Sequence, residues 1–171
     1  LNKENGEDAY VLRRRMEEIM MEKVGIFRNG KDLQEAVDEL EDLYKRSKNI
    51  EVFRCKSRAA NPALVNAYRT QMMIKVALTV ALGALLRTES RGAHSREDFP
   101  ARDDANWLKR TITSWPDANQ TLPSVTYEDI PIASMELPPG FRGYGKDLTE
   151  HHPDTQARQD TVDAVRKELE Q

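Results

Sequence analysis

The sequence contains a single cysteine, Cys55, among its 171 residues. A lone cysteine can form no disulfide within the chain, and it excludes metal sites that are built from paired cysteines. A catalytic cysteine needs a neighbouring group that lowers the pKa of its thiol, yet His94, His151 and His152 all lie far away in the sequence. We therefore interpret Cys55 as an ordinary reduced thiol of an intracellular protein.

Aromatic residues and excess positive charge are also scarce. Phe, Trp and Tyr make up 6% of the chain, the formal net charge is -3 and the pI is about 5.7. Domains that bind nucleic acids usually carry a basic face or a platform of aromatic side chains. The composition therefore argues against a nucleic-acid partner.

The chain has few glycines, and none of them forms a phosphate-binding loop. A dinucleotide-binding fingerprint requires Gly-x-Gly-x-x-Gly between a strand and a helix. Gly140, Gly143 and Gly145 follow two prolines and precede no strong helix, so they indicate a turn-rich tail instead.

Metal-ligand patterns are equally sparse. His151 and His152 lie beside Glu150 and Asp154, but adjacent residues rarely point to one centre, and no further strong ligand is placed near them. We expect these histidines to be solvated at the surface and predict no metal site.

One apolar stretch stands out, although it is shorter than the roughly 20 residues that span a bilayer. Within residues 72–86 only three positions are not strongly apolar: Lys75, Thr79 and Gly83. A helix that is apolar on nearly all sides is usually buried on nearly all sides. We predict a central helix that starts at Asn61-Pro62, an N-cap and first-turn proline, and ends near Arg87. Two shorter helices would not cover it completely, so a partner surface is expected.

Two amphipathic helices precede this stretch. A helix over residues 8–23 is predicted by apolar positions that repeat at i, i+4, i+7 and i+8, namely Leu12, Met16, Ile19 and Met20. A second helix is predicted over residues 31–48, with acidic residues in its first turn and basic residues in its last, as the helix dipole favours. Residues 1–8 are polar and are expected to fray.

The fold class is therefore predicted to be mainly α, and the chain is expected to have three parts. Residues 1–87 should form a spectrin-repeat-like, up-down-up three-helix bundle. Residues 88–147 should form a charged loop, a small β-hairpin and an extended Pro/Gly tail; the hairpin strands are predicted within 107–115 and 124–130. Residues 148–171 should form a polar C-terminal helix.

The segment 88–110 is the one place where chemically active side chains are dense. Its five basic and five acidic residues sum to zero charge. One reading is a set of arginines that holds an acidic or anionic partner, because the planar guanidinium binds carboxylates at two points. The other is a salt-bridge network that fixes the loop, and the balanced charge favours it. The candidate interface residues are Arg87, Glu89, Arg91, Gly92, His94, Arg96, Arg102 and Asp103. Gly92 would allow a sharp turn.

The same loop carries a family resemblance. Residues 87–100 read RTESRGAHSREDFP, and RDD at 102–104 and NWLK at 106–109 follow. This run resembles one near the C-terminus of fumarate reductase and succinate dehydrogenase flavoproteins. GIFR at 25–28 and PPGFRGYG at 138–145 are similar to the same family, so the resemblance covers most of residues 9–146. The tail and the acidic last helix look most like menaquinol-linked bacterial fumarate reductases.

The resemblance implies a parent flavoprotein that binds FAD and moves a hydride and a proton between the flavin and succinate or fumarate. Its electrons then pass through an iron–sulfur subunit to a membrane quinone site. The family's flavin-linking histidine, dinucleotide fingerprint and substrate-binding residues belong to segments N-terminal to this one. We therefore expect no catalytic, cofactor-binding or metal residue in this chain, which would be inactive alone.

The implied partners are the flavin domain of the same subunit and the iron–sulfur subunit, with loop 87–104 at the contact. The membrane would be reached only indirectly, through the quinone-binding subunit, which implies a cytoplasmic, peripheral location on the inner membrane. A different class of function stays open at this point: a non-enzymatic helical module for protein interaction that shares only the bundle. A small hydrolase or metal enzyme is disfavoured, since no nucleophile, acid or ligand set is visible.

Overall fold

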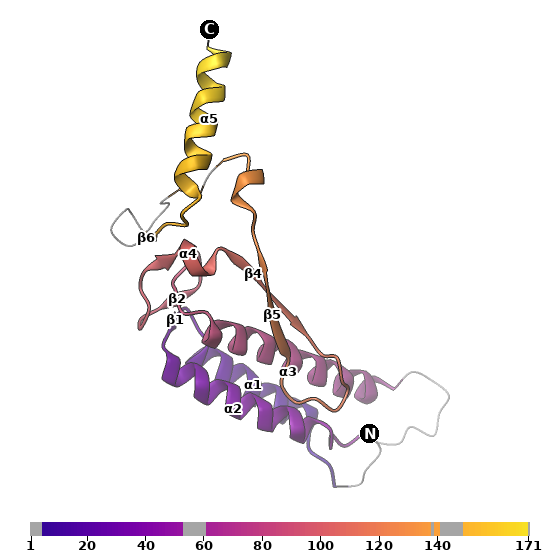
Figure 1. The fold of residues 1–171 in the computed structure, drawn as a ribbon. Helices are drawn as coiled ribbons and strands as arrows, with labels where there is room; N and C mark the ends of the chain where they lie inside the picture. The colour runs from indigo at the N-terminus through magenta and orange to yellow at the C-terminus, as the bar shows by residue number, and fades with distance from the viewer. Residues whose placement is uncertain (1–4, 53–60, 138, 141–148, 171) are drawn as a thin grey trace.

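Three helices lie side by side with alternating direction (Figure 1). The computed structural model describes residues 5–52, 61–137, 139–140 and 149–170. The helices are α1 (Ala9–Lys23), α2 (Gly30–Ser47) and α3 (Pro62–Leu86). They confirm the predicted three-helix bundle of a mainly α fold. Cys55 and the segment 141–148 of the glycine-containing tail lie outside the described residues.

Each of the three helices begins at a side-chain cap. The carboxylate of Asp8 and the amide oxygens of Asn29 and Asn61 accept hydrogen bonds from backbone N–H groups two or three residues ahead. These side chains satisfy donors that the first helical turn leaves unpaired. Pro62 occupies the first position of α3 as expected, since its missing N–H costs nothing there.

The core lies between the three helices and consists mainly of aliphatic side chains. Its fully buried members include Leu12, Ile19, Leu33, Leu40, Leu43, Ile74 and Leu78. Burying each such side chain stabilises the fold by about 1.5–3 kcal/mol. The helical periodicity seen in the sequence therefore marks the surface that the bundle buries.

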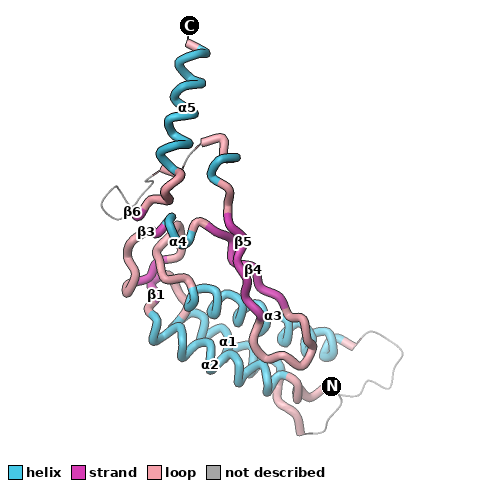
Figure 2. The backbone as a smooth tube through the Cα atoms, in the orientation of Figure 1, coloured by secondary structure: helices cyan, strands magenta, loops and turns pink. Residues whose placement is uncertain are grey.

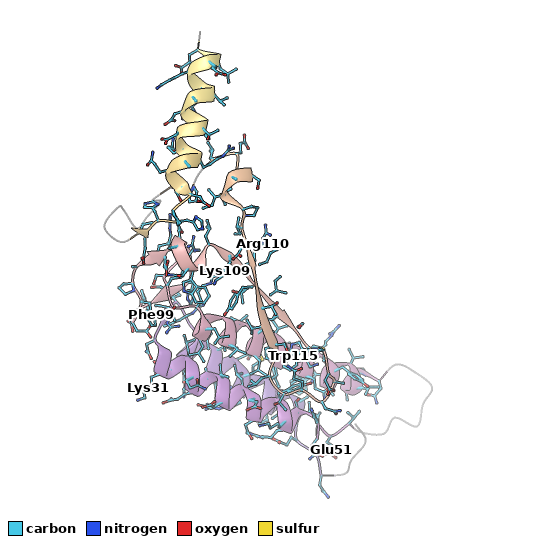
Figure 3. All side chains as sticks on the ribbon, viewed as in Figure 1. Lys31, Glu51, Phe99, Lys109, Arg110 and Trp115 are labelled. Atoms are coloured by element: carbon cyan, nitrogen blue, oxygen red, sulfur yellow. The ribbon has the colours of Figure 1, made fainter. Side chains whose placement is uncertain are left out.

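The predicted β-hairpin is present and crosses α3 (Figure 2). It consists of β4 (Lys109–Ser114) and β5 (Ser124–Asp129), which pair antiparallel. At its turn end Trp115 packs against Tyr44 of α2, with ring centroids 5.5 Å apart, and Figure 3 shows Trp115 directed toward the bundle. The hairpin thus covers one side of α3, which α1 and α2 leave open.

Several short elements were not expected from the sequence. Two pairs of two-residue strands run parallel: β1 (Phe27–Arg28) with β2 (Ser95–Arg96), and β3 (Arg102–Asp103) with β6 (Thr149–Glu150). A short helix, α4 (Asp104–Trp107), includes Trp107, so the first strand of the hairpin begins at Lys109 and not at residue 107. The tail expected to be extended contains a 3-10 helix, η1 (Ile132–Ser134). Elements this short carry no hydrophobic period, so the sequence gives no signal for them.

Residues 1–8 were expected to fray. Residues 1–4 lie outside the described residues, and for residues 5–8 the expectation is wrong. Glu7 forms two backbone hydrogen bonds with the α2–α3 connection. Its N–H donates to Asn49 O (2.9 Å), and its carbonyl oxygen accepts from Glu51 N–H (3.0 Å). Its carboxylate also binds Arg46. A Cβ at Gly6 would lie only 2.5 Å from Asn49 O, so this close approach requires glycine.

The last helix, α5 (Thr155–Leu169), stands away from the bundle in Figure 1. None of its described residues is buried, and Val165 and Leu169 are exposed. It contacts η1, where Arg158 Nε donates to Met135 O (2.7 Å). The helix therefore docks through its first turns and projects a polar surface with a thin apolar stripe.

Candidate functional site

The residues 87–104, here called the arginine strip, are organised around two buried carboxylates. Glu89 is fully buried and accepts from Arg87 Nη1 (2.5 Å), from Arg91 Nε (2.8 Å) and Nη2 (3.0 Å), and from the backbone N–H of Asp103 (2.9 Å). Four donors around one carboxylate satisfy its acceptor capacity. Glu89 is therefore an internal anchor of the strip.

Asp104 is the second buried carboxylate. Its two oxygens accept from Arg91 Nη2 (2.6 Å) and Arg102 Nη2 (2.7 Å). Arg91 thus bridges Glu89 and Asp104, so cations and anions alternate along the strip. Such charge-assisted hydrogen bonds are about twice as strong as neutral ones.

Arg96 connects the strip to the ends of two helices. Its Nη1 donates to Ala84 O and Leu85 O (both 2.9 Å), in the last turn of α3. Its Nε and Nη2 hold the carboxylate of Asp98 at 2.7 Å each, and Asp98 in turn accepts from the first N–H of α2, that of Gly30 (3.0 Å). A cation at a helix C-terminus and an anion at a helix N-terminus both complement the helix dipole. The Arg96 guanidinium lowers the pKa of the Asp98 carboxyl to about 2.

Arg28 gives the end of α1 a similar cap. Its Nε donates to Gly25 O (2.9 Å) and Val24 O (3.2 Å), and its Nη1 donates to His94 Nδ1 (2.9 Å). Since arginine can only donate, His94 Nδ1 carries no proton, and its Nε2–H donates to Arg87 O (3.3 Å). Burial, followed by the charges of neighbouring arginines, lowers the pKa of His94. His94 is thus held as a neutral imidazole that joins two helix ends.

The exposed corner of the strip is a tight turn. Gly92 has a φ of +59°, and the backbones of Arg91 and His94 exchange two hydrogen bonds of 2.8 and 2.9 Å across it. The left-handed conformation explains the glycine, as the sequence suggested. Gly92 and Ala93 are exposed, whereas Arg96 and Arg102 are only 2% and 4% exposed.

Together these contacts bring seven of the eight candidate interface residues into one internal network that also reaches Arg28, Asp98 and Asp104. The sequence did not single out these three residues as candidates. The partners of Arg28 and Asp98 lie far away in the sequence, and the strip holds so many charges that the partner of Asp104 cannot be assigned from the sequence alone. The remaining candidate, Gly92, shapes the turn. The network matches the salt-bridge reading of the charge balance, and it leaves only the rim of the strip for an outside partner.

A different part of the molecule is open: the side of α3 that faces away from α2. Met72, Val76 and Val80 are 49%, 62% and 44% exposed, although α3 was expected to be buried on nearly all sides. Together with α1 they line an apolar groove of about 390 Å³, formed by Met16, Met20, Met72, Met73, Val76, Ala77 and Val80. Exposed apolar patches of this kind mark interaction sites.

The length and composition of α3 would also fit a membrane span. The buried core helix of a globular protein can have the same length and composition, so the packing of α3 distinguishes the two interpretations. One face of α3 is buried against α1 and α2, and its sequence includes Arg69 and Lys75. We therefore interpret α3 as the central helix of the bundle.

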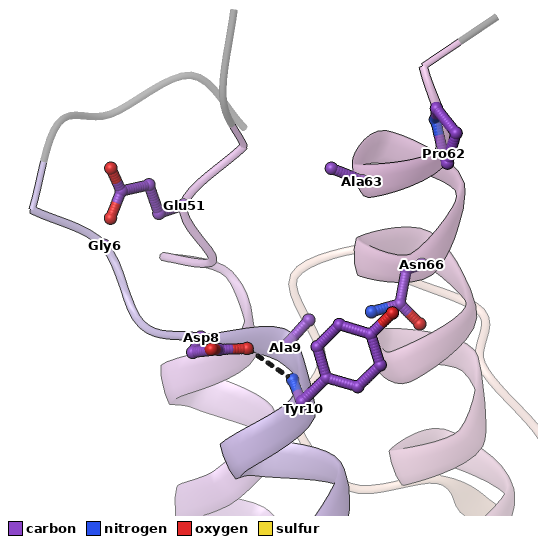
Figure 4. Close-up of a pocket in the computed structure, with 8 residues that line it drawn as sticks. All are labelled: Gly6, Asp8, Ala9, Tyr10, Glu51, Pro62, Ala63 and Asn66. Carbon is purple, nitrogen blue, oxygen red and sulfur yellow. Dashed lines mark hydrogen bonds between the residues drawn. The ribbon is translucent and has the colours of Figure 1, made fainter.

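A further pocket of about 370 Å³ lies near the start of α1 and α3 (Figure 4). The hydrogen bond drawn there is the helix cap from Tyr10 N to Asp8 Oδ1 (2.7 Å). That use of the carboxylate fits a structural role.

The described residues contain no cluster of three metal-ligating side chains. His151 and His152, which were expected to be solvated, are partly buried.

The sequence and fold were compared with known proteins. The sequence profile of the family described as fumarate reductase flavoprotein C-term matches residues 13–144. The chain belongs to this family. It is 56% identical over 146 residues to the fumarate reductase flavoprotein subunit of Helicobacter pylori strain J99, covering 85% of this chain and 20% of that protein. The succinate dehydrogenase flavoprotein subunit of Coxiella burnetii is 38% identical over 108 residues, which covers 63% of this chain and 18% of that protein.

Solved structures of the family show the same fold. A quinol fumarate reductase from E. coli matches with a TM-score of 0.69 at 32% identity, covering 85% of this chain and 24% of that chain. A quinol–fumarate reductase with menaquinol molecules matches with a TM-score of 0.70 at 34% identity, covering 79% and 23%. The chain thus spans about a fifth of the length of the first curated relatives it matches, and it is the C-terminal domain of the flavoprotein subunit.

Proposed function

We propose that this domain is a structural and subunit-contact element of a fumarate reductase or succinate dehydrogenase and has no activity alone. The observation that carries the proposal is a contrast between two regions. The charges of the arginine strip are paired within the chain, whereas the apolar groove on α1 and α3 is left open by the described residues. A bundle with one uncovered apolar face is suited to pack against another body.

The parent enzyme would interconvert succinate and fumarate with FAD as its cofactor and exchange electrons with the quinone pool. The names of the relatives support this activity, since they are fumarate reductase and succinate dehydrogenase flavoprotein subunits. FAD would be held outside this chain, because the sequence has no Gly-x-Gly-x-x-Gly fingerprint and the β1–α2 and β3–α4 junctions do not fit its pyrophosphate. The first turn of α2 already binds Asp98, and Asp103 and Asp104 start α4. Carboxylates at those positions would repel a phosphate.

The proposed partners are the flavin domain of the same subunit and the iron–sulfur subunit. The parent would lie on the cytoplasmic side of the inner membrane as a peripheral component and reach the membrane through a quinone-binding subunit. The similarity to structures named quinol fumarate reductase supports this placement. Within the strip, the exposed rim at Gly92 and Ala93 is the part that could contact a partner.

The division of the chain into residues 1–87, 88–147 and 148–171 stays part of the proposal. Arg28 binds the end of α1, Asp98 binds the start of α2, and Arg96 binds the end of α3. Residues 88–104 would therefore behave as an extension of the bundle in this scheme. The terminal part with α5 would be the most independent, since none of its described residues is buried.

The proposal is tested by assaying the purified 171-residue chain beside the complete flavoprotein complex. The chain alone should show no flavin absorbance and no succinate-dependent dye reduction, while the complex shows both. Turnover by the isolated chain would contradict the proposal. The alternative, an interaction module of unrelated function, would be favoured if affinity capture recovered neither the flavin domain nor the iron–sulfur subunit.

A further inference from the structure

A second groove lies where α3 passes beneath the hairpin, next to the arginine strip. It has a volume of about 320 Å³ and is lined by Arg28, Thr79, Val80, Gly83, Ala84, Arg87, His94, Thr111 and Thr113. We call it the cationic groove, because arginines are its only charged lining residues. No carboxylate is among the residues that line it.

Among the residues that the structure describes, Arg28 is the cation of this groove that has no counter-ion. Arg87, Arg91, Arg96 and Arg102 each pair with a carboxylate, but Arg28 has no carboxylate within 4.0 Å among the described residues. Its Nε and Nη1 bind backbone carbonyls and His94, which leaves Nη2 without an acceptor there. Burial lowers the pKa of Arg28. A desolvated guanidinium without a counter-ion costs free energy that an incoming anion would recover.

Two hydroxyl groups add neutral donors to the groove. Thr111 Oγ1 accepts from Arg87 Nη2 (3.3 Å), so its own proton can be donated elsewhere. Thr113 lies two residues further along β4, on the same face of the strand. Burial lowers the pKa of His94 most, and the charges of Arg28, Arg96 and Arg87 lower it further, which agrees with a positive potential here. These groups together are suited to one carboxylate.

The cationic groove and the apolar groove meet at Val80. Val80 lines both of them. Met72, Val76, Val80 and Gly83 follow one another at helical spacing along α3, and Arg87 is the C-cap of that helix. A small free anion would engage only the cationic end. A polypeptide surface could cover both, since protein interfaces combine a central apolar part with polar groups at the rim.

We propose that this face of α1, α3 and β4 binds a polypeptide surface whose apolar side chains fill the apolar groove and whose aspartate or glutamate pairs with Arg28. The carboxylate would accept from Arg28 Nη2 and from the hydroxyls of Thr111 and Thr113. The inference rests on the proposed function, because the remaining part of the flavoprotein would supply this surface. It adds the chemistry of the contact and its location away from the buried arginines of the strip.

The test uses hydrogen exchange on the complete flavoprotein complex carrying either Thr113→Asp or the matched control Thr113→Asn. The aspartate places a carboxylate inside the cationic groove, where it would compete with that of the partner, whereas asparagine adds similar volume without charge. Amides in residues 76–87 and 109–113 should exchange at least tenfold faster in Thr113→Asp than in Thr113→Asn. Circular dichroism of both variants in the 171-residue chain checks that each still folds.

The exchange rates distinguish the carboxylate contact from the packing of this face. If both variants exchange alike in a complex that protects these segments, the carboxylate contact is wrong while the proposed packing stands. If the wild-type segments exchange as fast in the complex as in the 171-residue chain alone, this face is not covered. That result would overturn both the inference and the packing on which it rests.

Discussion

The arginine strip and the apolar groove lie on the same bundle, but they differ in how far their side chains are satisfied by contacts within the chain. In the strip, Glu89 and Asp104 are fully buried and each is surrounded by donors from its own chain. In the groove, Met72 and Val76 are about half exposed or more, and none of the described residues covers them fully. The charged region is therefore the self-sufficient one, and the apolar region is the one that lacks a partner.

This comparison changes the meaning of a dense charge cluster. Arginines suggest recognition of an outside anion, yet four of the five arginines around the strip are held by carboxylates of the same segment. They cap helix ends and fix a loop that has little apolar surface of its own. Recognition would instead fall to Arg28, which has no such carboxylate, and to the apolar residues beside it.

The largest expected effect is at Glu89. Glu89→Gln removes the charge that Arg87 and Arg91 share, and breaking a buried pair should cost about 3 kcal/mol of unfolding free energy, the low end of the range for such pairs. The exposed Glu97→Gln serves as a matched control and should change stability by less than about 0.5 kcal/mol. Urea unfolding followed by circular dichroism measures both. Equal effects of the two variants would show that the strip is not an internal anchor.

A smaller effect is expected where the strip meets α2. In Gly30→Ala the new Cβ would lie 3.0 Å from Asp98 Oδ2 and 3.3 Å from Arg96 Nη2, so we expect a loss of about 1–2 kcal/mol from overpacking. Gly83→Ala is the matched control, because its Cβ would meet only Thr111 Cγ2 at 4.0 Å. That change should stabilise α3 by about 0.5–1 kcal/mol. Thermal unfolding should therefore give shifts of opposite sign, and a stabilising Gly30→Ala would refute the tight junction.

The pH dependence of His94 sharpens the same comparison. Its pKa in the folded chain lies below the ordinary value of 6.5, so the unfolded chain takes up the proton first as the pH falls. Its contribution to stability is fully present above pH 6.5 and declines below it, until the lowered pKa of the folded state is reached. An NMR titration should show a neutral ring with its proton on Nε2 at pH 7. A midpoint at or above 6.5 would mean that Arg28 does not donate to Nδ1.

The smallest effect on folding is expected in the apolar groove. Val76 is 62% exposed, so Val76→Ser should change the stability of the 171-residue chain by less than about 0.5 kcal/mol. In the complete flavoprotein the same substitution should lower the yield of assembled complex, because the side chain would be covered there. Size-exclusion chromatography of the complex provides the readout. Unchanged assembly together with clear destabilisation of the isolated chain would show that Val76 contributes to the fold of the chain and not to a contact in the complex.

The helices could be predicted from the sequence because their signals are local. The repeat of Leu12, Met16 and Ile19 marks the buried side of α1, and the caps Asn29 and Asn61 stand at the starts of the next two helices. The hairpin also follows from β-branched residues on either side of a turn. The family resemblance was carried by the strip and is confirmed by the match over residues 13–144.

The site could be predicted only in part. Balanced charge indicated a network, but the partner of each arginine depends on the fold: Arg28 meets His94 across 66 residues of sequence, and Asp98 meets Gly30 across 68. The two-residue strands that align these segments leave no periodic signal. The exposed stripe of α3 was anticipated from its excess of apolar residues, yet which side stays open depends on where the hairpin crosses.

Native-state hydrogen exchange of the isolated 171-residue chain tests the central claim most directly. If the strip is held by its own carboxylates, the amides of Ser90 and Asp103, which donate to Ala101 O and to Glu89, should be protected to a degree close to that of the α2 core. Exchange of these amides at the rate of an unstructured chain, with protection appearing only in the complete complex, would show that the partner orders the strip and would contradict the account.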